Sequence, residues 1–223
     1  MKWQIYHFDE VSSTNELAHS YPVYAVVVAD HQTAGRGRHG RIWESVNGNL
    51  YGSLVLPDFN EKNPYLAFIV GVAVASALAE FDVRLKWPND VLLDGKKIGG
   101  ILLEQASGKL IAGIGINLVG HPTGQMAYPV GNLGGRVSKL QLIQRILNEM
   151  DAYLKLFKEK GFAGIREKWL TLSYLQTGDN MSVRLPHQTY TGKLNGIDEN
   201  GLLLLELEDR TILKISAGDV FKI

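Results

Sequence analysis

Cysteine is absent from this chain of 223 residues, and neither sign of charge prevails. Without cysteine there is no disulfide framework, no thiolate zinc site and no cysteine nucleophile, which is typical of a protein of a reducing compartment. Lys and Arg number 23, and Asp and Glu also number 23, so the formal net charge is zero. No overall field therefore attracts a nucleic-acid backbone or an anionic membrane, and recognition of an anion requires a local cluster of basic residues.

Long hydrophobic runs are also missing. The longest apolar stretch, Tyr65 to Ala79, is interrupted by Gly71 and Ser76 and is shorter than the roughly 20 residues of a membrane span. It follows Asn63-Pro64, a helix cap and a proline at the first helical position, so it predicts a helix in the core. The N-terminus lacks the apolar segment and cleavage site of a signal peptide. We expect a soluble, cytoplasmic protein that does not contact a membrane.

Short β-rich segments alternate with helical patterns over most of the chain. Strands are expected at Gln4 to Phe8, Tyr24 to Ala29, Leu50 to Leu56, Val91 to Leu93, Ile98 to Leu103 and Leu110 to Leu118. Apolar residues at spacings of three and four predict a long amphipathic helix that starts at Ser138 and stops before Gly161. A short helix carrying Ile165, Trp169 and Leu170 is expected next, and residues 120–135 are expected to be an irregular connector.

After Thr177-Gly178-Asp179, the sequence pattern changes to that of short strands at close spacing. These are expected at Met181 to Leu185, Tyr190 to Ile197, Leu202 to Leu207, Ile212 to Ile215 and Val220 to Ile223. Such spacing predicts a small β-barrel of about 45 residues. We therefore expect two domains, residues 1–176 and 177–223, with the main site in the first.

Three glycines and three arginines occupy six of the seven positions from Gly35 to Arg41. Glycine exposes the backbone, and arginine offers planar donors to phosphate or carboxylate, so the segment predicts an anion-binding loop. The alternative is a surface loop that contacts nothing, or one that contacts nucleic-acid phosphate. A P-loop is excluded, because no G-x-x-x-x-G-K-[ST] pattern occurs in the chain.

The run Lys86-Trp87-Pro88-Asn89-Asp90 leads through an Asp94-Gly95 hairpin turn to Lys97, Gly99 and Gly100. Taken alone, Pro-Asn-Asp is most often a plain turn and a glycine pair a bulge. Together, they favour a site in which Asn89 and Asp90 hold a magnesium ion and nucleotide hydroxyls, Lys97 reaches a phosphate and the glycines admit a ligand to the backbone.

The segment from Ser12 to Leu17 opens with the pattern Ser13-x-x-Glu16, which is a capping box. Helix capping explains this pattern fully. The same geometry also presents free N–H groups and hydroxyls to a small polar ligand, so both interpretations stay open.

These three segments, in this order, resemble the biotin protein ligases, that is, the biotin–[acetyl-CoA-carboxylase] ligases. The resemblance implies an α+β fold, with a mixed β-sheet flanked by helices and a small C-terminal SH3-like β-barrel. It implies activation of biotin by ATP, with Mg²⁺, to biotinyl-5′-AMP and transfer to a lysine of the biotin carboxyl carrier protein of acetyl-CoA carboxylase. The first strand begins near residue 2, so the chain looks like the short form without an N-terminal DNA-binding domain, acting as a monomer or homodimer.

The resemblance also implies residue roles. Arg38, Lys97 and Lys86 would be catalytic. Biotin would be bound by Ser13, Thr14, Asn15, Gln32, Gly35, Arg36, Gly37, Arg38, Lys97, Gly100 and Gly115. ATP would be bound by Arg38, Arg41, Trp43, Lys86, Asn89, Asp90 and Asn117, with Asp90 as the magnesium ligand.

Three rival functions are consistent with parts of the pattern. A lipoate or octanoate protein ligase or transferase shares the fold, but those families lack the Gly-Arg loop and the Lys-Trp-Pro-Asn-Asp motif. A nucleic-acid-binding module would use the arginine loop, although the net charge of zero argues against it. A sensor would hold an adenylate without turnover and release no pyrophosphate.

Because no DNA-binding segment precedes the first expected strand, we predict that the protein does not bind operator-like DNA specifically, even with biotin and ATP present. An electrophoretic mobility assay at physiological salt tests this. A sequence-specific shift would contradict it.

Overall fold

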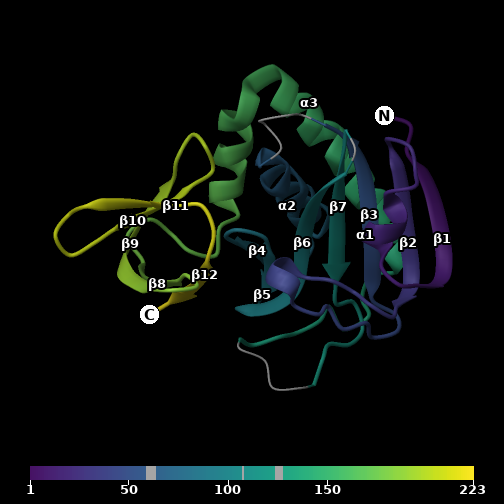
Figure 1. Ribbon diagram of the computed structural model, residues 1–223, viewed down its shortest axis with the longest axis horizontal. Helices are drawn as coiled ribbons and strands as arrows, with labels where there is room; N and C mark the ends of the chain where they lie inside the picture. The colour runs from purple at the N-terminus through teal and green to yellow at the C-terminus, as the bar shows by residue number, and fades with distance from the viewer. Residues whose placement is uncertain (59–63, 107, 124–127) are drawn as a thin grey trace.

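The computed structural model describes residues 1–58, 64–106, 108–123 and 128–223. It contains a seven-stranded mixed sheet with helices and a separate five-stranded antiparallel sheet (Figure 1). The α+β class expected from the sequence is confirmed.

The large sheet has the strand order β1-β2-β3-β7-β6-β5-β4. Its strands are β1 (Gln4–Val11), β2 (Ala25–Gln32), β3 (Leu50–Pro57), β4 (Val83–Lys86), β5 (Asp90–Leu93), β6 (Lys96–Ala106) and β7 (Lys109–Ile116). β1 runs parallel to β2, and the other neighbouring pairs are antiparallel. The sequence prediction misses β4, because this four-residue strand depends on tertiary hydrogen bonds. Its Leu85 exchanges backbone hydrogen bonds of 2.8 Å with Leu172 and Tyr174, far along the chain.

The helical elements of the main domain are α1 (Thr14–Ala18), the 3₁₀ turn η1 (Arg38–Gly40), α2 (Tyr65–Ala77) and α3 (Lys139–Thr171). α2 starts after Pro64, whereas Asn63, the expected cap, lies outside the described residues. A Ser138–Gln141 capping box opens α3, and Gly161 interrupts it with a φ of 64°. This break confirms the expected helix stop and the short helix beyond it. None of the described helices is both long and apolar enough to cross a lipid bilayer.

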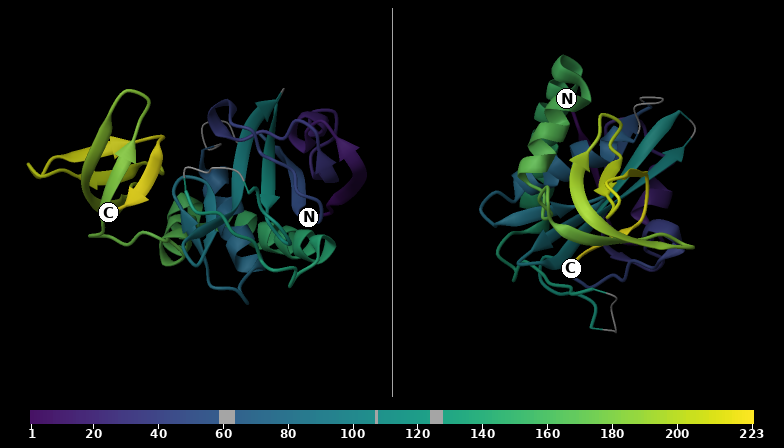
Figure 2. Two further views of the ribbon diagram at one scale, coloured as in Figure 1. Left: turned by 90° about the horizontal axis from the view of Figure 1, so that it is seen from below. Right: turned by 90° about the vertical axis from the view of Figure 1, so that its left-hand side faces the viewer.

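The two faces of the large sheet have different coverings (Figures 1 and 2). α2 and α3 pack on one face, where Leu54, Ile101 and Ile114 belong to the main hydrophobic cluster. α1 packs on the other face against a smaller cluster that includes Val55 and Ile111. Successive strand residues point to opposite faces, so one set of side chains builds the core and the alternate set remains available for a site.

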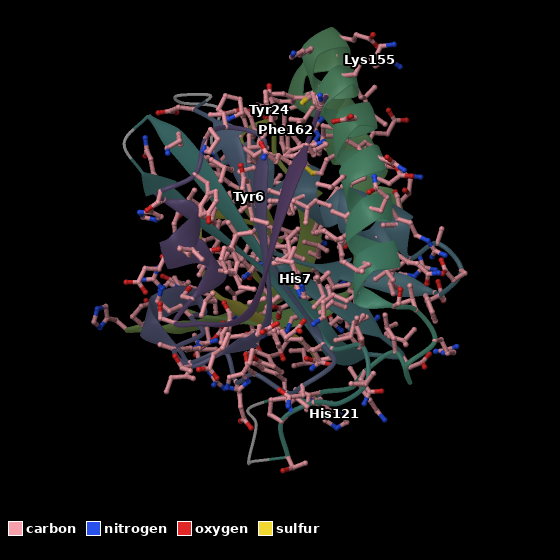
Figure 3. The ribbon with its side chains drawn as sticks, turned by 90° about the vertical axis from the view of Figure 1, so that its right-hand side faces the viewer. Tyr6, His7, Tyr24, His121, Lys155 and Phe162 are labelled. Atoms are coloured by element: carbon pink, nitrogen blue, oxygen red, sulfur yellow. The ribbon has the colours of Figure 1, made fainter. Side chains whose placement is uncertain are left out.

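β1 forms the free edge of the sheet. Figure 3 looks onto this edge and shows Tyr6 and His7 along the strand, with Lys155 of α3 near the top of the view. The Tyr6 ring packs on Tyr21, with centroids 4.4 Å apart, and His7 Nε2 lies 2.9 Å from Asp30 Oδ1. Side chains on both faces of this edge strand are thus held by β2 and by the segment after α1.

The small sheet, with strand order β11-β10-β9-β8-β12, matches the five expected C-terminal strands. They are β8 (Asn180–Arg184), β9 (Thr189–Ile197), β10 (Leu203–Glu206), β11 (Ile212–Ile215) and β12 (Asp219–Lys222). Trp87 anchors this barrel to the main domain, because its Nε1 donates to the Gly201 carbonyl at 3.2 Å. We propose the domain division at 176/177, since Tyr174 still hydrogen-bonds to β4 whereas Gly178 donates to Leu194 of β9.

The buried face of α3 gives a test of this packing. Ile146 is fully buried and Gln144 is exposed. We expect Ile146→Ala to lower the free energy of unfolding by about 2–5 kcal/mol, because it removes apolar contacts and leaves a cavity. The control Gln144→Ala should change it by less than about 0.5 kcal/mol. Equal effects of both variants in urea unfolding would refute this packing.

Candidate functional site

A cavity of about 420 Å³ opens on the α1 side of the large sheet, next to the barrel. That volume lies in the range of small-molecule sites. The sequence-predicted residues that line it are Ser13, Thr14, Asn15, Gln32, Arg36, Gly37, Arg38, Arg41, Trp43, Lys86, Asn89, Asp90, Lys97, Gly100 and Gly115. The fold thus brings the three motif segments together around one cavity.

Bare backbone forms the floor of the pocket. Gly100 of β6 pairs with Gly115 of β7, and both face the ring of Trp43. A Cβ on residue 115 would lie 2.6 Å from Trp43 Cε2, so the indole can rest on the sheet only because residue 115 is glycine. Trp43 Nε1 is buried, and no acceptor for it lies within the described parts of the chain.

One end of the pocket is formed by the start of α1. Ser13 caps this helix by accepting a hydrogen bond from the Glu16 backbone N–H, at 3.5 Å. The Glu16 carboxylate accepts a hydrogen bond from the Ser12 hydroxyl at 2.9 Å. The first half of the predicted capping box, in which Ser13 accepts from the Glu16 backbone, is therefore present. The backbone N–H and hydroxyl of Thr14 both donate to Gln32 Oε1, at 2.8 and 3.1 Å, which fixes the Gln32 amide.

Lys97 lines the pocket and is largely buried. Its ammonium pairs with Asp90 at 2.6 Å and donates to the Tyr128 hydroxyl at 3.3 Å. Burial acts to lower the Lys97 pKa, but Asp90 and Tyr128 more than offset it and raise the pKa above its ordinary value. Lys97 therefore stays protonated in the physiological range.

Lys86 lies nearby in a different environment. Its ammonium is 5.2 Å from the ring centroid of Phe221 in the barrel and 5.8 Å from that of Tyr128. Burial is the main cause that lowers its pKa, while the charge of Asp90 acts in the opposite direction. The aromatic rings stabilise the charge of Lys86 through cation–π interactions. Among the described residues, no carboxylate is hydrogen-bonded to Lys86.

The three arginines of the Gly-Arg loop have separate partners. Arg38 donates to Asn89 Oδ1 at 3.2 Å, and burial lowers its pKa, although a guanidinium stays charged in any case. Arg36 pairs with Glu104 at 3.2 Å. Arg41 makes a bidentate ion pair with Asp219 of β12, which ties the loop to the barrel.

The charge around the cavity is strongly one-sided. Among the described lining residues, six cations, Arg36, Arg38, Arg41, Lys86, Lys97 and Arg184, face only two carboxylates, Asp90 and Asp219. The whole chain has no net charge, so this is the local cluster that anion recognition requires. The pocket fits a ligand with several negative charges.

Gly35 and Asn117 are outside the lining. A Cβ at Gly35 would collide with the Trp43 carbonyl, so this glycine permits the loop to fold back on itself. Asn117 Nδ2 donates to the Gly131 carbonyl at 2.9 Å, and its Oδ1 accepts from Asn49 at 3.4 Å. These contacts join the end of β7 to the connector, and the ligand roles expected of both residues remain predictions.

Sequence reasoning missed several residues of the wall. Tyr128 comes from the connector, and Arg184, Asp219 and Phe221 come from the barrel. Neither segment carries a local pattern that points to a ligand, since only the folded chain brings them to β4 and β5. The main site was expected in the first domain, but the barrel also forms part of its wall.

Residues 8–120 match the model of the biotin/lipoate A/B protein ligase family, and residues 178–223 match that of the biotin protein ligase C-terminal domain. The chain therefore belongs to the biotin/lipoate A/B protein ligase family.

Individual relatives show more specifically which proteins the chain resembles. The chain is 37% identical to the bifunctional ligase/repressor BirA of Bacillus subtilis, over 97% of this chain and 73% of that protein. It is 32% identical to the biotin–[acetyl-CoA-carboxylase] ligase of Mycobacterium tuberculosis, over 87% of this chain and 77% of that protein. Its fold matches biotin protein ligase from Aquifex aeolicus in complex with biotin and ATP, with a TM-score of 0.85, 31% identity and 99% coverage of both chains.

The Arg41–Asp219 pair predicts how firmly the loop is held. The hydrogen bond from Arg41 is the main cause that keeps the Asp219 pKa below its ordinary value of 3.8. The pair is thus complete above pH 3.8 and is lost as the pH falls through the lower pKa of the folded state. We expect Asp219→Asn to increase hydrogen–deuterium exchange of residues 35–43 at neutral pH roughly two- to five-fold, as for a partly exposed ion pair.

The matched control is Asp179→Asn, which removes the 2.8 Å pair with Lys222 on the barrel and leaves the loop contact intact. Loop exchange in this control should equal that of the wild type. If Asp219→Asn exchanges no faster than Asp179→Asn, the ion pair does not hold the loop.

Proposed function

We propose that the protein is an ATP-dependent ligase that activates biotin as biotinyl-5′-AMP and transfers it to a lysine of a biotin carboxyl carrier protein. The observation that carries this proposal is the excess of cations around a glycine-floored pocket. Together, the biotin carboxylate and the ATP triphosphate carry about five negative charges. Six cationic side chains, set against two carboxylates, can interact favourably with them. The relatives named as biotin–[acetyl-CoA-carboxylase] ligases support the same acid and acceptor.

Two ends of the pocket would take the two ends of biotin. The ureido ring needs donors and acceptors at short range, and the α1 end offers both through Ser13, Thr14 and Gln32. The valerate tail is apolar and would lie beside the Trp43 ring, which rests on the backbone of Gly100 and Gly115. Its carboxylate would then reach the region of Lys97 and Arg38.

ATP would occupy the side next to the barrel. Trp43 would offer its ring to the adenine, and Lys86, Arg38 and Arg41 would hold the phosphates. Asn89, which donates to the Ile101 carbonyl at 2.7 Å, keeps its Oδ1 turned to Arg38 and so orients that guanidinium. Lys86 lies near two rings and has no hydrogen-bonded carboxylate among the described residues, so it can pair with a phosphate at little cost.

A magnesium ion fits this site as a companion of the nucleotide. No group of three His, Asp or Glu side chains gathers as a metal site within the described ranges, so the protein alone does not form a full cage. Mg²⁺ needs only one or two carboxylates besides phosphate and water, and Asp90 is the carboxylate in place. When bound, the ion would shield the charge of the pyrophosphate group.

The reaction has two steps. A biotin carboxylate oxygen attacks the α-phosphorus of ATP, the bond to the β-phosphate oxygen breaks and pyrophosphate leaves. The acceptor lysine amine then attacks the acyl carbon of the mixed anhydride, its nitrogen releases a proton to solvent, and AMP leaves with the electron pair of the acyl–oxygen bond. Lys97 and Arg38 would bring two anions together and stabilise the added charge, which is catalysis by positioning and electrostatics. This chemistry requires no protein nucleophile, in keeping with the absence of cysteine, which also favours a cytoplasmic location.

Pyrophosphate release tests the function directly. We expect release only when biotin and ATP are both present, and none above background with lipoate in place of biotin. We expect Lys97→Ala to slow release about ten- to a hundred-fold, because it removes a charge-assisted contact of about 1.5–3 kcal/mol.

The control is the exposed neighbour Lys96→Ala, which should release pyrophosphate at the wild-type rate. Release that depends on lipoate, or no release at all, would overturn the proposed function. An unchanged rate in Lys97→Ala would instead reject only the role of that lysine.

A further inference from the structure

Behind the α1 end of the pocket, Asn15 is held from two sides. Its Nδ2 donates to Glu104 Oε2 of β6 at 2.6 Å, and its Oδ1 lies 2.6 Å from the hydroxyl of Ser53 on β3. β7 runs between these two strands, and its Gly113 lies beneath the amide. A Cβ at residue 113 would be 2.9 Å from Asn15 Cγ, so only glycine admits this arrangement. Neither Glu104 nor Ser53 lines the pocket itself.

The Glu104 carboxylate fixes which way the amide of Asn15 and the hydroxyl of Ser53 point. An ionised carboxylate only accepts hydrogen bonds, so Asn15 must turn its NH₂ group to Glu104 and its carbonyl oxygen to Ser53. Ser53, which is fully buried, must then donate its single hydroxyl proton to Asn15. The Ser53 oxygen also lies 2.8 Å from Thr14 Oγ1, whose own proton is donated to Gln32 Oε1 at 3.1 Å.

This order extends to the pocket surface. Thr14 donates its hydroxyl proton to Gln32 Oε1, so it can offer only a lone pair to a ligand. Gln32 turns its Oε1 to Thr14, so its NH₂ group is the polar group that remains for a ligand. The α1 end thus presents an acceptor and a donor side by side. A cyclic urea has the matching pair, an N–H and a carbonyl.

The same carboxylate oxygen also binds the Gly-Arg loop. Arg36 Nη2 donates to Glu104 Oε2 at 3.2 Å. Glu104 is therefore shared between the α1 end and the loop, although these segments are more than twenty residues apart in the sequence and belong to separate elements.

We propose that Glu104 is a positioning residue for biotin. Its charge sets the hydrogen-bond direction of Asn15 and Ser53, which lie behind Thr14, and holds Arg36 beside it, so that the pocket end is ordered for the urea head before the ligand arrives. This inference rests on the proposed function. It adds a residue that the ligand does not touch.

Glu104→Gln is the sharpest variant, because it keeps the shape of the side chain and removes the charge. Glutamine can present either its oxygen or its NH₂ to Asn15, so the network loses its fixed direction, and Arg36 loses its ionic partner. We expect the Kd for biotin, measured by isothermal titration calorimetry, to rise roughly ten-fold, as for the loss of a hydrogen bond to a charged group. The Kd for ATP and the melting temperature should stay at wild-type values.

The matched control is Glu206→Gln in the barrel. Glu206 is 25% exposed and paired with Arg210 at 2.6 Å, whereas Glu104 is 27% exposed and paired with Arg36. We expect this control to bind biotin as the wild type does. The control thus distinguishes a general effect of losing an ion-paired carboxylate from an effect that is specific to Glu104.

A double-mutant comparison tests whether Glu104 acts through Asn15. In an Asn15→Ala background, Glu104→Gln should weaken biotin binding by less than about three-fold, because the amide that it orients is gone. The same ten-fold effect in both backgrounds would show that Glu104 does not work through Asn15 and would overturn the proposal.

Two further results would also overturn it. The first is biotin binding by Glu104→Gln that is as tight as that of the wild type. The second is a loss of ATP affinity and melting temperature in parallel with biotin affinity, which is the mark of a merely structural residue. Failure of the proposed function would look different, because the wild type itself would then bind no biotin.

Discussion

The structure depends on one constraint, namely that the central strands β6 and β7 must serve two faces at once. On one face, Ile101 and Ile114 are buried against α2 and α3. On the other, the alternate positions Gly100, Gly113 and Gly115 carry no side chain. Strand alternation makes this possible, since residues i and i+2 share a face. The apolar half stabilises the sheet, and the bare half lets Asn15 and Trp43 approach its backbone.

A pocket with a large excess of positive charge would be costly to bury without local compensation. The protein solves this differently for each cation. Lys97 has a carboxylate partner, Lys86 has two aromatic rings, and Arg38 has the amide of Asn89. Lys97 is held most firmly, whereas Lys86 has the weakest interactions with the protein itself. Buried charges that lack strong partners are those most ready to pair with a ligand.

Local patterns in the sequence were sufficient for the parts of the site that come from single segments. Two such segments are the glycines and arginines from Gly35 to Arg41 and the Lys-Trp-Pro-Asn-Asp run. Each indicates its chemistry in the sequence, because the residues that line the site there are close together in the chain. Glu104 and Ser53 could not be found in this way, since each is an ordinary strand residue until Asn15 is placed between them. The same holds for β4, whose pairing with residues near Leu172 exists only in the folded chain.

The position of the barrel against the main domain has a consequence for how the two parts respond to ligands. Arg41–Asp219, Lys86–Phe221 and Trp87–Gly201 are contacts between parts of the chain that are distant in sequence. Because the pocket wall includes residues from both, a ligand that touches both binds more tightly when the barrel is seated. Reciprocity then requires that the ligand seat the barrel more firmly by the same factor. The free energy that holds the barrel in place thus becomes a function of ligand concentration, although no helix or strand of the barrel needs to change shape.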